Sequence, residues 1–437
     1  MDTAPDRLES AVVSRLMWRL MPFLFLLYIV AYLDRINVSF GVLQMRGQLG
    51  LSDRVYGRAA GIFFAGYFFF QLPSNLVLEK FGVRRWISAL MIIWGIISCL
   101  MIFIRGPISF YAMRFLLGAA EAGFFPGIIL YMKRWFPANA RARAVAWFMT
   151  ANPLAGVVGS PISGALLGLR GGGLSGWQWM FLIEAVPAIL MTLAVLYYLT
   201  DRPKQAQWLQ PQESQWLQDR LDAERANRER HGAMSWFQSM LDPRVIALGF
   251  VYMGCNIPQY GLSFFLPQIV KGFGELSNIE VGCITALPYV VGAIGMLFWS
   301  RHSDKTAERK WHTVIPLAII VVGLALAAVM PTPLTKMIFL CVAGFGFFAV
   351  LPVFWTLPTT FLTGTGAAAG IAAVNSIGNL GGFFGPKVFG ALKDYTGGDF
   401  ASLMFLAACA IIGAVIVLVL GHNPALEQPA AQTAGAR

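Results

Sequence analysis

Two acidic and two basic residues lie inside stretches of the chain that are otherwise strongly apolar. Asp34 and Arg35 are adjacent in "YLDRINVSF", and Arg114 and Glu121 are seven residues apart in "MRFLLGAAEAGFF". An ionised side chain at the centre of a membrane span costs at least about 2.5 kcal/mol on insertion scales, so residues of this kind are rare and mark functional sites. These four residues are therefore the first candidates for the chemistry of this chain.

Arginine and carboxyl side chains together can couple an anion to a proton. The planar guanidinium binds a carboxylate through two hydrogen bonds and keeps its charge, whereas a carboxyl group can take up a proton. If Asp34 or Glu121 becomes protonated, its arginine partner is released, and the added positive charge matches one substrate carboxylate. Proton and anion would then bind cooperatively. The alternative is that the four residues form buried ion pairs that only stabilise the fold.

The surrounding composition predicts an all-α membrane protein. The 437 residues are 57% hydrophobic and only 13% charged, against roughly 25% charged in soluble domains. Twelve apolar runs reach the roughly 20 residues that a membrane-spanning helix needs, and they are too continuous for alternating strands. The runs fall near residues 20–45, 56–79, 86–104, 107–132, 144–168, 177–199, 245–270, 279–300, 311–330, 335–360, 366–392 and 400–421.

Helix geometry places the four charged residues at one depth. Counting about 1.5 Å per residue from the basic residues at the outer ends of the first and fourth runs puts all four between about 13 and 24 Å deep. Arg114 and Glu121, seven residues apart, are expected on one face of their helix. The four charges are therefore expected in one central slab.

The positive charges of the loops predict the orientation in the membrane. Most of the 33 Lys and Arg residues fall in alternate loops, on the side that carries the amino terminus. The positive-inside rule then places both termini in the cytoplasm of a bacterial inner-membrane protein. Because the basic residues are spread over short loops, nucleic-acid binding is excluded.

The chain divides into two related halves. We expect a six-helix bundle over residues 1–199, a cytoplasmic linker over 200–244, a second bundle over 245–421 and a cytoplasmic tail over 422–437. An amphipathic surface helix opened by Pro211 and Glu213 is expected in the linker. An offset of 225 residues superposes "EKFGVRRW" on "DKTAERKW", so the repeat is parallel, and a substrate site is expected between the halves near the midplane.

The two superposed loops predict a charge clamp at the cytoplasmic face that changes partners as the halves move. Ordinary positive-inside anchoring is the alternative. The six residues are Glu79, Arg84, Arg85, Asp304, Arg309 and Lys310.

Several motifs resemble the anion:cation symporter family of the major facilitator superfamily, in the branch of bacterial tartrate, phthalate and hydroxyphenylacetate carriers. They are "YLDRINVSF", "GIFFAGYFFFQLPSN", "MRFLLGAAEAGFFPGIILYMKRWFPANARARA", "GWQWMFLIEAVPAIL" and "NSIGNLGGFFGP". The resemblance implies twelve helices and transport by alternating access. It also implies proton coupling by Asp34 and Glu121, and substrate binding by Arg35, Arg114, Tyr32 and Tyr67.

Polar residues of the second half are candidates for the neutral part of the substrate. Their spacing at i, i+3 and i+4 indicates shared helix faces, and hydrogen bonding between helices is the alternative. They are Asn256, Gln259, Tyr260, Trp355, Asn375 and Asn379. Glu184 is expected to pair with a neighbouring helix. Lys387 is expected to snorkel outward or to meet an incoming anion.

The sequence thus predicts a carrier that imports a small organic carboxylate with protons, as a monomer and without another cofactor. The five cysteines and four histidines form no metal-ligand spacing, and nucleophile and phosphate-loop motifs are absent, which excludes an enzyme. A Gly- and Pro-containing motif, "GVVGSPISG", favours a rival reading as a proton-coupled antiporter, efflux pump or anion exchanger. A transporter-like membrane sensor is a further alternative. The choice of organic acid stays open.

Overall fold

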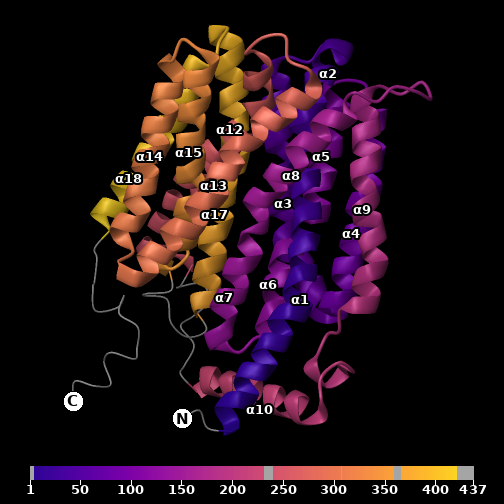
Figure 1. Cartoon of the computed structure of the whole chain (residues 1–437), viewed down its shortest axis with the longest axis vertical. Coiled ribbons are helices and arrows are strands. Elements are labelled where there is room, and N and C mark those ends of the chain that lie inside the picture. Colours follow the sequence, from indigo (N-terminus) through magenta and orange to yellow (C-terminus); the bar gives the residue numbers. More distant parts are fainter. Residues whose placement is uncertain (1–3, 231–239, 307, 359–365, 421–437) are drawn as a thin grey trace.

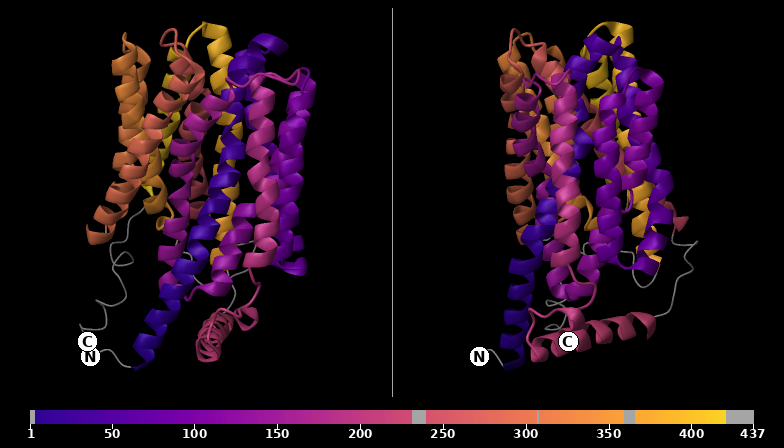
Figure 2. Two further views of the ribbon diagram at one scale, coloured as in Figure 1. Left: turned by 45° about the vertical axis from the view of Figure 1, so that its right-hand side comes forward. Right: turned by 90° about the vertical axis from the view of Figure 1, so that its right-hand side faces the viewer.

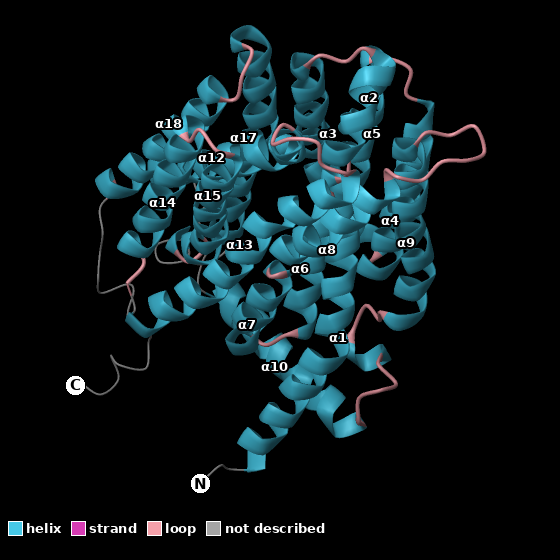
Figure 3. Cartoon of the chain, turned by 45° about the horizontal axis from the view of Figure 1, so that its top comes forward, coloured by secondary structure: helices cyan, strands magenta, loops and turns pink. Residues whose placement is uncertain are grey.

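The computed structural model describes residues 4–230, 240–306, 308–358 and 366–420. Within these ranges the chain is helical, apart from short loops and one isolated bridge between Gly171 and Leu174 (Figure 3). Helices satisfy their own backbone hydrogen bonds, which lipid cannot do, and this accounts for the architecture of long apolar runs.

The first half contains nine α-helices and one 3₁₀ helix in the described residues. They are α1 (Ala4–Ile36), α2 (Val38–Leu49), α3 (Asp53–Phe81), α4 (Val83–Leu100), η1 (Met101–Phe103), α5 (Pro107–Glu121), α6 (Phe124–Trp135), α7 (Ala138–Met149), α8 (Ala151–Leu166) and α9 (Gly176–Tyr198).

The linker and the second half follow. The linker contains η2 (Pro203–Gln205) and α10 (Pro211–Arg230). The second half contains α12 (Pro243–Lys271), α13 (Asn278–Thr306), α14 (Lys310–Val329), α15 (Pro333–Phe354), α17 (Gly366–Thr396) and α18 (Phe400–Val419).

Three of the predicted runs are interrupted rather than continuous. The first breaks at Asn37 between α1 and α2, the fourth at Ala122 and Gly123 between α5 and α6, and the fifth at Thr150 between α7 and α8. Space explains why glycine stands at one break, because a Cβ built on Gly123 would lie 1.8 Å from the Ser74 hydroxyl oxygen of α3. Side chains before and after each break therefore point in directions that differ from those in one straight helix.

Ten helical segments of the described chain are long and apolar enough to cross a membrane. The other two of the twelve predicted runs correspond to the α7–α8 pair, whose parts are individually short, and to α17, which carries several polar residues. The predicted all-helical class is confirmed.

The two ends of the molecule differ. α1 begins and α18 ends toward the end that carries α10, which we call the terminal end, and the opposite end is the far end (Figure 1). Figure 2 shows α10 lying across the terminal end, transverse to the long helices. The Arg15 guanidinium contacts the Glu213 carboxylate at 2.7 Å, and Trp208 stacks on Trp135 at 5.4 Å between ring centroids. The linker is thereby fastened to the first half, and the surface helix expected in the linker is confirmed.

At the far end the two halves are pressed together. A Cβ built on Gly57 of α3 would lie 2.3 Å from the Pro386 carbonyl oxygen of α17, so only glycine permits this approach. The backbone N–H groups of Asp53 and Arg54 donate to the Asp394 carboxylate at 3.0 and 2.7 Å. The hydrogen bonds that Asp53, Arg54 and Tyr56 make to the second half all lie toward the far end.

Candidate functional site

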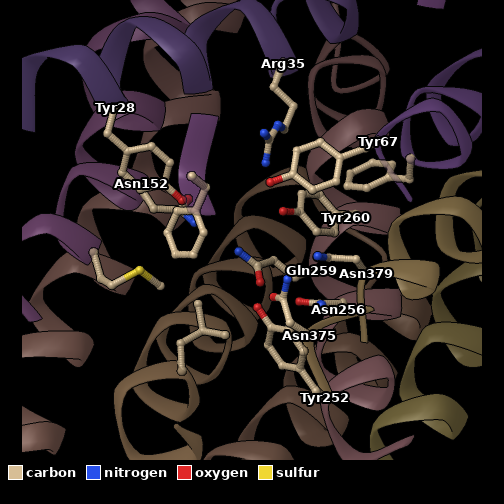
Figure 4. Close-up of a pocket in the computed structure, with 14 residues that line it drawn as sticks. Tyr28, Arg35, Tyr67, Asn152, Tyr252, Asn256, Gln259, Tyr260, Asn375 and Asn379 are labelled. Atoms are coloured by element: carbon tan, nitrogen blue, oxygen red, sulfur yellow. The ribbon is translucent and has the colours of Figure 1, made fainter. Parts of the chain in front are cut away.

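A cavity of about 530 Å³, counting its open mouth, lies between the two halves near mid-depth (Figure 4). Fourteen residues line the cavity: Tyr28, Arg35, Phe64, Tyr67, Phe125, Met149 and Asn152 from the first half, and Tyr252, Asn256, Gln259, Tyr260, Leu351, Asn375 and Asn379 from the second. Of these, only Arg35 carries a full charge.

Aromatic contacts between the halves close the cavity toward the far end. The rings of Phe64 and Tyr260 lie 4.5 Å apart, and the Tyr56 hydroxyl donates to the Phe264 carbonyl oxygen at 2.6 Å. The ring contact and the hydrogen bond between the halves thus lie on the far-end side of the cavity.

Arg35 points into the cavity and is held there by a buried carboxylate. Its Nη2 and Nε atoms donate to Glu121 Oε2 at 3.0 and 3.3 Å. Arg35 occupies the last turn of α1, where the helix dipole favours a cation. In Figure 4 the hydroxyl groups of Tyr67 and Tyr260 lie near the end of its guanidinium group. The predicted pairing of an arginine with a carboxylate is thus present at the cavity wall.

Arg114 lies behind this pair and does not line the cavity. It is fully buried, and its guanidinium lies 4.8 Å from the ring centre of Phe63 and 5.9 Å from that of Phe264 in the other half. Its Nη2 makes one long contact, 3.5 Å, with the Arg35 carbonyl oxygen, and its Nε and Nη1 have no partner in the described part. An unpaired buried guanidinium is available for an anion if the halves separate here.

Asp34, adjacent to Arg35 in α1, faces away from the cavity. Its Oδ1 accepts a hydrogen bond from the Ser98 hydroxyl of α4 at 2.9 Å, and no described arginine contacts it. Tyr32 is also outside the cavity, fully buried against Ala155 of α8. The structure therefore brings together Arg35, Tyr67 and Glu121 from the predicted set.

The second half supplies neutral polar groups. Five of its six predicted residues line the cavity, and the Asn256 amide nitrogen donates to the Gly378 carbonyl oxygen at 3.0 Å. Trp355 is the exception, because its ring packs on Tyr252 at 4.9 Å instead. Three polar lining residues were not predicted, namely Tyr28, Asn152 and Tyr252. Tyr28 and Tyr252 each lie four residues before a predicted site residue, a spacing that could have indicated them.

Glu184 and Lys387 are two further charged residues within the spans, and each contacts a neighbouring side chain. Glu184 of α9 accepts a hydrogen bond from the Ser163 hydroxyl of α8 at 2.6 Å, so the expected partner on a neighbouring helix is confirmed. The Lys387 ammonium of α17 lies 4.8 Å from the ring centre of Phe383.

The six predicted gating residues lie at the terminal end, and the contacts of three of them described here stay within one half or join it to the linker. Arg309 binds Asp304 at 2.8 Å, and the Lys310 ammonium donates to the Leu418 carbonyl oxygen at 3.0 Å. The Arg84 backbone N–H donates to Asp201 at 2.9 Å. The remaining two, Glu79 and Arg85, are exposed. A clamp between the halves stays a prediction.

Comparisons with known proteins agree with this architecture. The family model of the Major Facilitator Superfamily matches residues 24–386. A relative from Agrobacterium vitis, named "Putative tartrate transporter", is 50% identical over 95% of this chain and 96% of the relative. A "Quinolone resistance transporter" from Acinetobacter baumannii is 39% identical over 97% of this chain and 98% of the relative.

Solved structures show the same fold at low identity. A bacterial homolog of the human lysosomal transporter Spinster, in an inward-facing conformation, superposes with a TM-score of 0.74 and 17% identity. The match covers 91% of this chain and 95% of that chain. The resemblance to bacterial tartrate carriers expected from the motifs is confirmed by the relatives. This chain belongs to the Major Facilitator Superfamily and is a multi-pass membrane transporter, not an enzyme.

Proposed function

We propose that this transporter imports a small hydroxylated organic acid, with tartrate as the first candidate, together with protons. The observation that carries the proposal is the cavity itself. One guanidinium, Arg35, is paired with the buried carboxylate of Glu121, and amides and phenols line the rest. A substrate carboxylate can replace Glu121 on Arg35 when Glu121 takes up a proton.

The charges of the first half support proton coupling. Arg35 and Arg114 balance Asp34 and Glu121, so the buried group is neutral when all four residues are ionised. One proton on Glu121 gives it the single positive charge that matches one carboxylate, and a second proton on Asp34 would match a dianion. Entry of the anion without protons would leave uncompensated buried charge, which is expensive in a low-dielectric region.

The second half favours a substrate with hydroxyl groups. Because the Asn256 nitrogen donates one N–H to the Gly378 carbonyl, its amide oxygen and its second N–H are the groups available to a ligand. An amide oxygen accepts from a hydroxyl group but repels a carboxylate. The amides of Gln259, Asn375 and Asn379 add both donors and acceptors. Tartrate has hydroxyl groups beside each carboxylate, and the name of the 50% identical relative points to the same acid.

The charges of the loops support an orientation of the chain in the membrane. The positive-inside rule assigns the terminal end, with the linker, to the cytoplasm. From the contacts between the halves at the opposite end, we infer that the described conformation faces inward, where an imported acid would leave. We place the transporter in a bacterial inner membrane, acting as a monomer.

Efflux or anion exchange is the second candidate. The 39% identical quinolone resistance transporter and the Gly- and Pro-containing motif of α8 favour it. In that motif Gly159 contacts Leu33 of α1, since a Cβ there would lie 2.0 Å from a Leu33 methyl group. Close helix packing therefore accounts for Gly159 without antiport.

Uptake by proteoliposomes tests the choice. Labelled tartrate, phthalate, 4-hydroxyphenylacetate and galactonate would be supplied outside under an inward proton gradient, with succinate as a competitor that lacks hydroxyl groups. We expect tartrate to accumulate and a proton ionophore to abolish the accumulation. Gradient-driven expulsion of a quinolone, with no acid accumulated, would contradict import and favour the second candidate.

A further inference from the structure

A second polar cluster lies inside the first half, apart from the cavity. It comprises Asp34, Asn37, Ser98, Ser163 and Glu184, contributed by α1, the α1–α2 break, α4, α8 and α9. All five are at most 7% exposed, and none lines the cavity. Buried polar groups in a membrane protein are costly unless paired, so a cluster of this size calls for a function.

Glu184 has hydrogen-bonding partners but no counter-ion. The Ser163 hydroxyl donates to Oε1 at 2.6 Å, whereas Oε2 has no partner among the described atoms. The Asn37 side chain lies beside the same carboxyl group. As the neutral acid, Glu184 can donate from Oε2 to the Asn37 amide oxygen, and as the carboxylate it can accept from the Asn37 amide nitrogen.

No described cation neutralises Glu184. α8 carries no charged residue, and the two arginines of α1 and α2 nearest the cluster are occupied elsewhere. Arg35 binds Glu121, and Arg46 binds Asp53 at 3.0 Å. The titratable groups that remain nearby are Asp34 on α1 and, beside it, the Cys99 thiol on α4. A buried carboxylate without a cation is disfavoured by several kcal/mol, so this carboxyl is suited to carrying a proton.

Asn37 lies beside the Glu184 carboxyl group and follows Asp34 closely in the chain. It follows Asp34 by three residues and therefore lies on the same side of the helix, one turn toward the far end. Both polar atoms of its amide are buried and have no hydrogen bond of normal geometry in the described part. An amide can donate to an ionised carboxylate and accept from a protonated one, so it can serve both neighbours in either proton distribution.

The two carboxyl groups, Glu184 and Asp34, lie at different depths below the far end. Glu184 lies eight residues into α9 from the far end, or about 12 Å, and Asp34 lies fifteen residues from the far end of α2, or about 22 Å. Glu184 is therefore a step between the far surface and Asp34.

We propose that Glu184 is a third proton-binding carboxyl of this transporter, which relays protons between the far end and Asp34 through the interior of the first half. The proposal rests on the proton coupling proposed above. In the step, Glu184 loses its proton as Asp34 gains one, so one carboxyl is ionised before and after, and Asn37 reorients its hydrogen bonds. Protons and substrate would then travel by separate routes.

The test compares two transport modes in proteoliposomes. Tartrate uptake driven by an inward proton gradient requires proton delivery, whereas counterflow of labelled against unlabelled tartrate does not. We expect Glu184→Gln to slow gradient-driven uptake at least tenfold and to leave counterflow within about twofold of wild type. Glu184→Asp should restore part of the driven rate. Thr192→Val, which removes another buried hydroxyl of α9 bonded only within its own helix, is the control and should change neither mode.

The outcomes separate this inference from the proposed function. If wild type shows no gradient-driven uptake of any acid, the proposed proton coupling fails. If wild type accumulates tartrate and Glu184→Gln matches its driven rate, the relay is wrong. Equal loss of both modes in a folded Glu184→Gln protein also overturns it, because the residue would then be structural. Should that variant not fold, Ser163→Ala is expected to shift the pH of half-maximal driven uptake while sparing counterflow, and an unchanged pH profile contradicts the relay.

Discussion

Removing the carboxylate of Asp394 is expected to loosen the far end of the transporter. Asp394, near the end of α17 in the second half, accepts from the first two backbone N–H groups of α3, at Asp53 and Arg54, at 3.0 and 2.7 Å. A carboxylate at a helix amino terminus satisfies free N–H groups and complements the helix dipole. These bonds exist only while the far end is closed.

The magnitude follows from the number and exposure of these bonds. Hydrogen bonds to a charged group contribute about 1.5 to 3 kcal/mol each when well shielded. Because the Asp394 side chain is exposed, we take about 1 kcal/mol for both bonds together, which corresponds to roughly a fivefold change in equilibrium. Asp394→Ala should therefore raise the ratio of far-open to far-closed molecules about fivefold, and Asp394→Asn, which keeps an acceptor oxygen, by less.

Spin-label or fluorophore pairs across α3 and α17 at the far end would measure this ratio in lipid nanodiscs. Asp399→Asn is the matched control, because Asp399 binds Lys393 and Lys336 within its own half. It removes the same charge at the same end without touching α3. An unchanged distance distribution in Asp394→Ala, or an equal shift in the control, would refute the reasoning.

Three further predictions concern the cavity, the closure and the linker. Asn256→Leu should weaken tartrate binding about tenfold, since one hydrogen-bonded contact is lost, while succinate competes unchanged; equal weakening of both acids would contradict the assignment of Asn256 to a hydroxyl group. Gly57→Val should abolish uptake and raise thiol labelling at the far end, because its Cβ would lie 2.3 Å from the Pro386 carbonyl oxygen; wild-type uptake would show that this approach is not required. Trp208→Ala should lower thermal stability in detergent by about 1 kcal/mol through loss of its stacked ring, and an unaltered melting temperature would mean that the linker is fastened elsewhere.

The apolar runs predicted the helices well, because lipid leaves the backbone no other way to satisfy its hydrogen bonds. The rotation of each helix about its own axis, which decides the side chains that face the cavity, is harder to predict. Asp34 and Arg35 are adjacent, and adjacent residues on a helix point about 100° apart. One of them had to leave the cavity, and the structure turns Arg35 inward and Asp34 toward Ser98. Depth along the membrane can be counted from the ends of the apolar runs, but it does not tell which way a side chain faces.

The neutral half of the site was predicted where polar residues repeat on one face, as with Asn256, Gln259 and Tyr260. Tyr28 and Tyr252 were missed, because a tyrosine in a span suits lipid interfaces, helix contacts and cavities equally. Asn152 was missed although an amide in an apolar run is a signal. Its place at the cavity follows the break at Thr150, which Pro153 in the first turn of α8 marks, because proline has no N–H to continue the preceding helix.

The central claim is that Glu121 takes up a proton and releases Arg35 when the acid binds. The most direct test is tartrate transport by Glu121→Gln in proteoliposomes, measured both under an inward proton gradient and as counterflow, with internal pH recorded. We expect gradient-driven accumulation and its proton flux to be lost while counterflow continues, because Arg35 remains in the cavity without its competitor. Accumulation by Glu121→Gln to the wild-type level, with the same proton flux, would contradict the account.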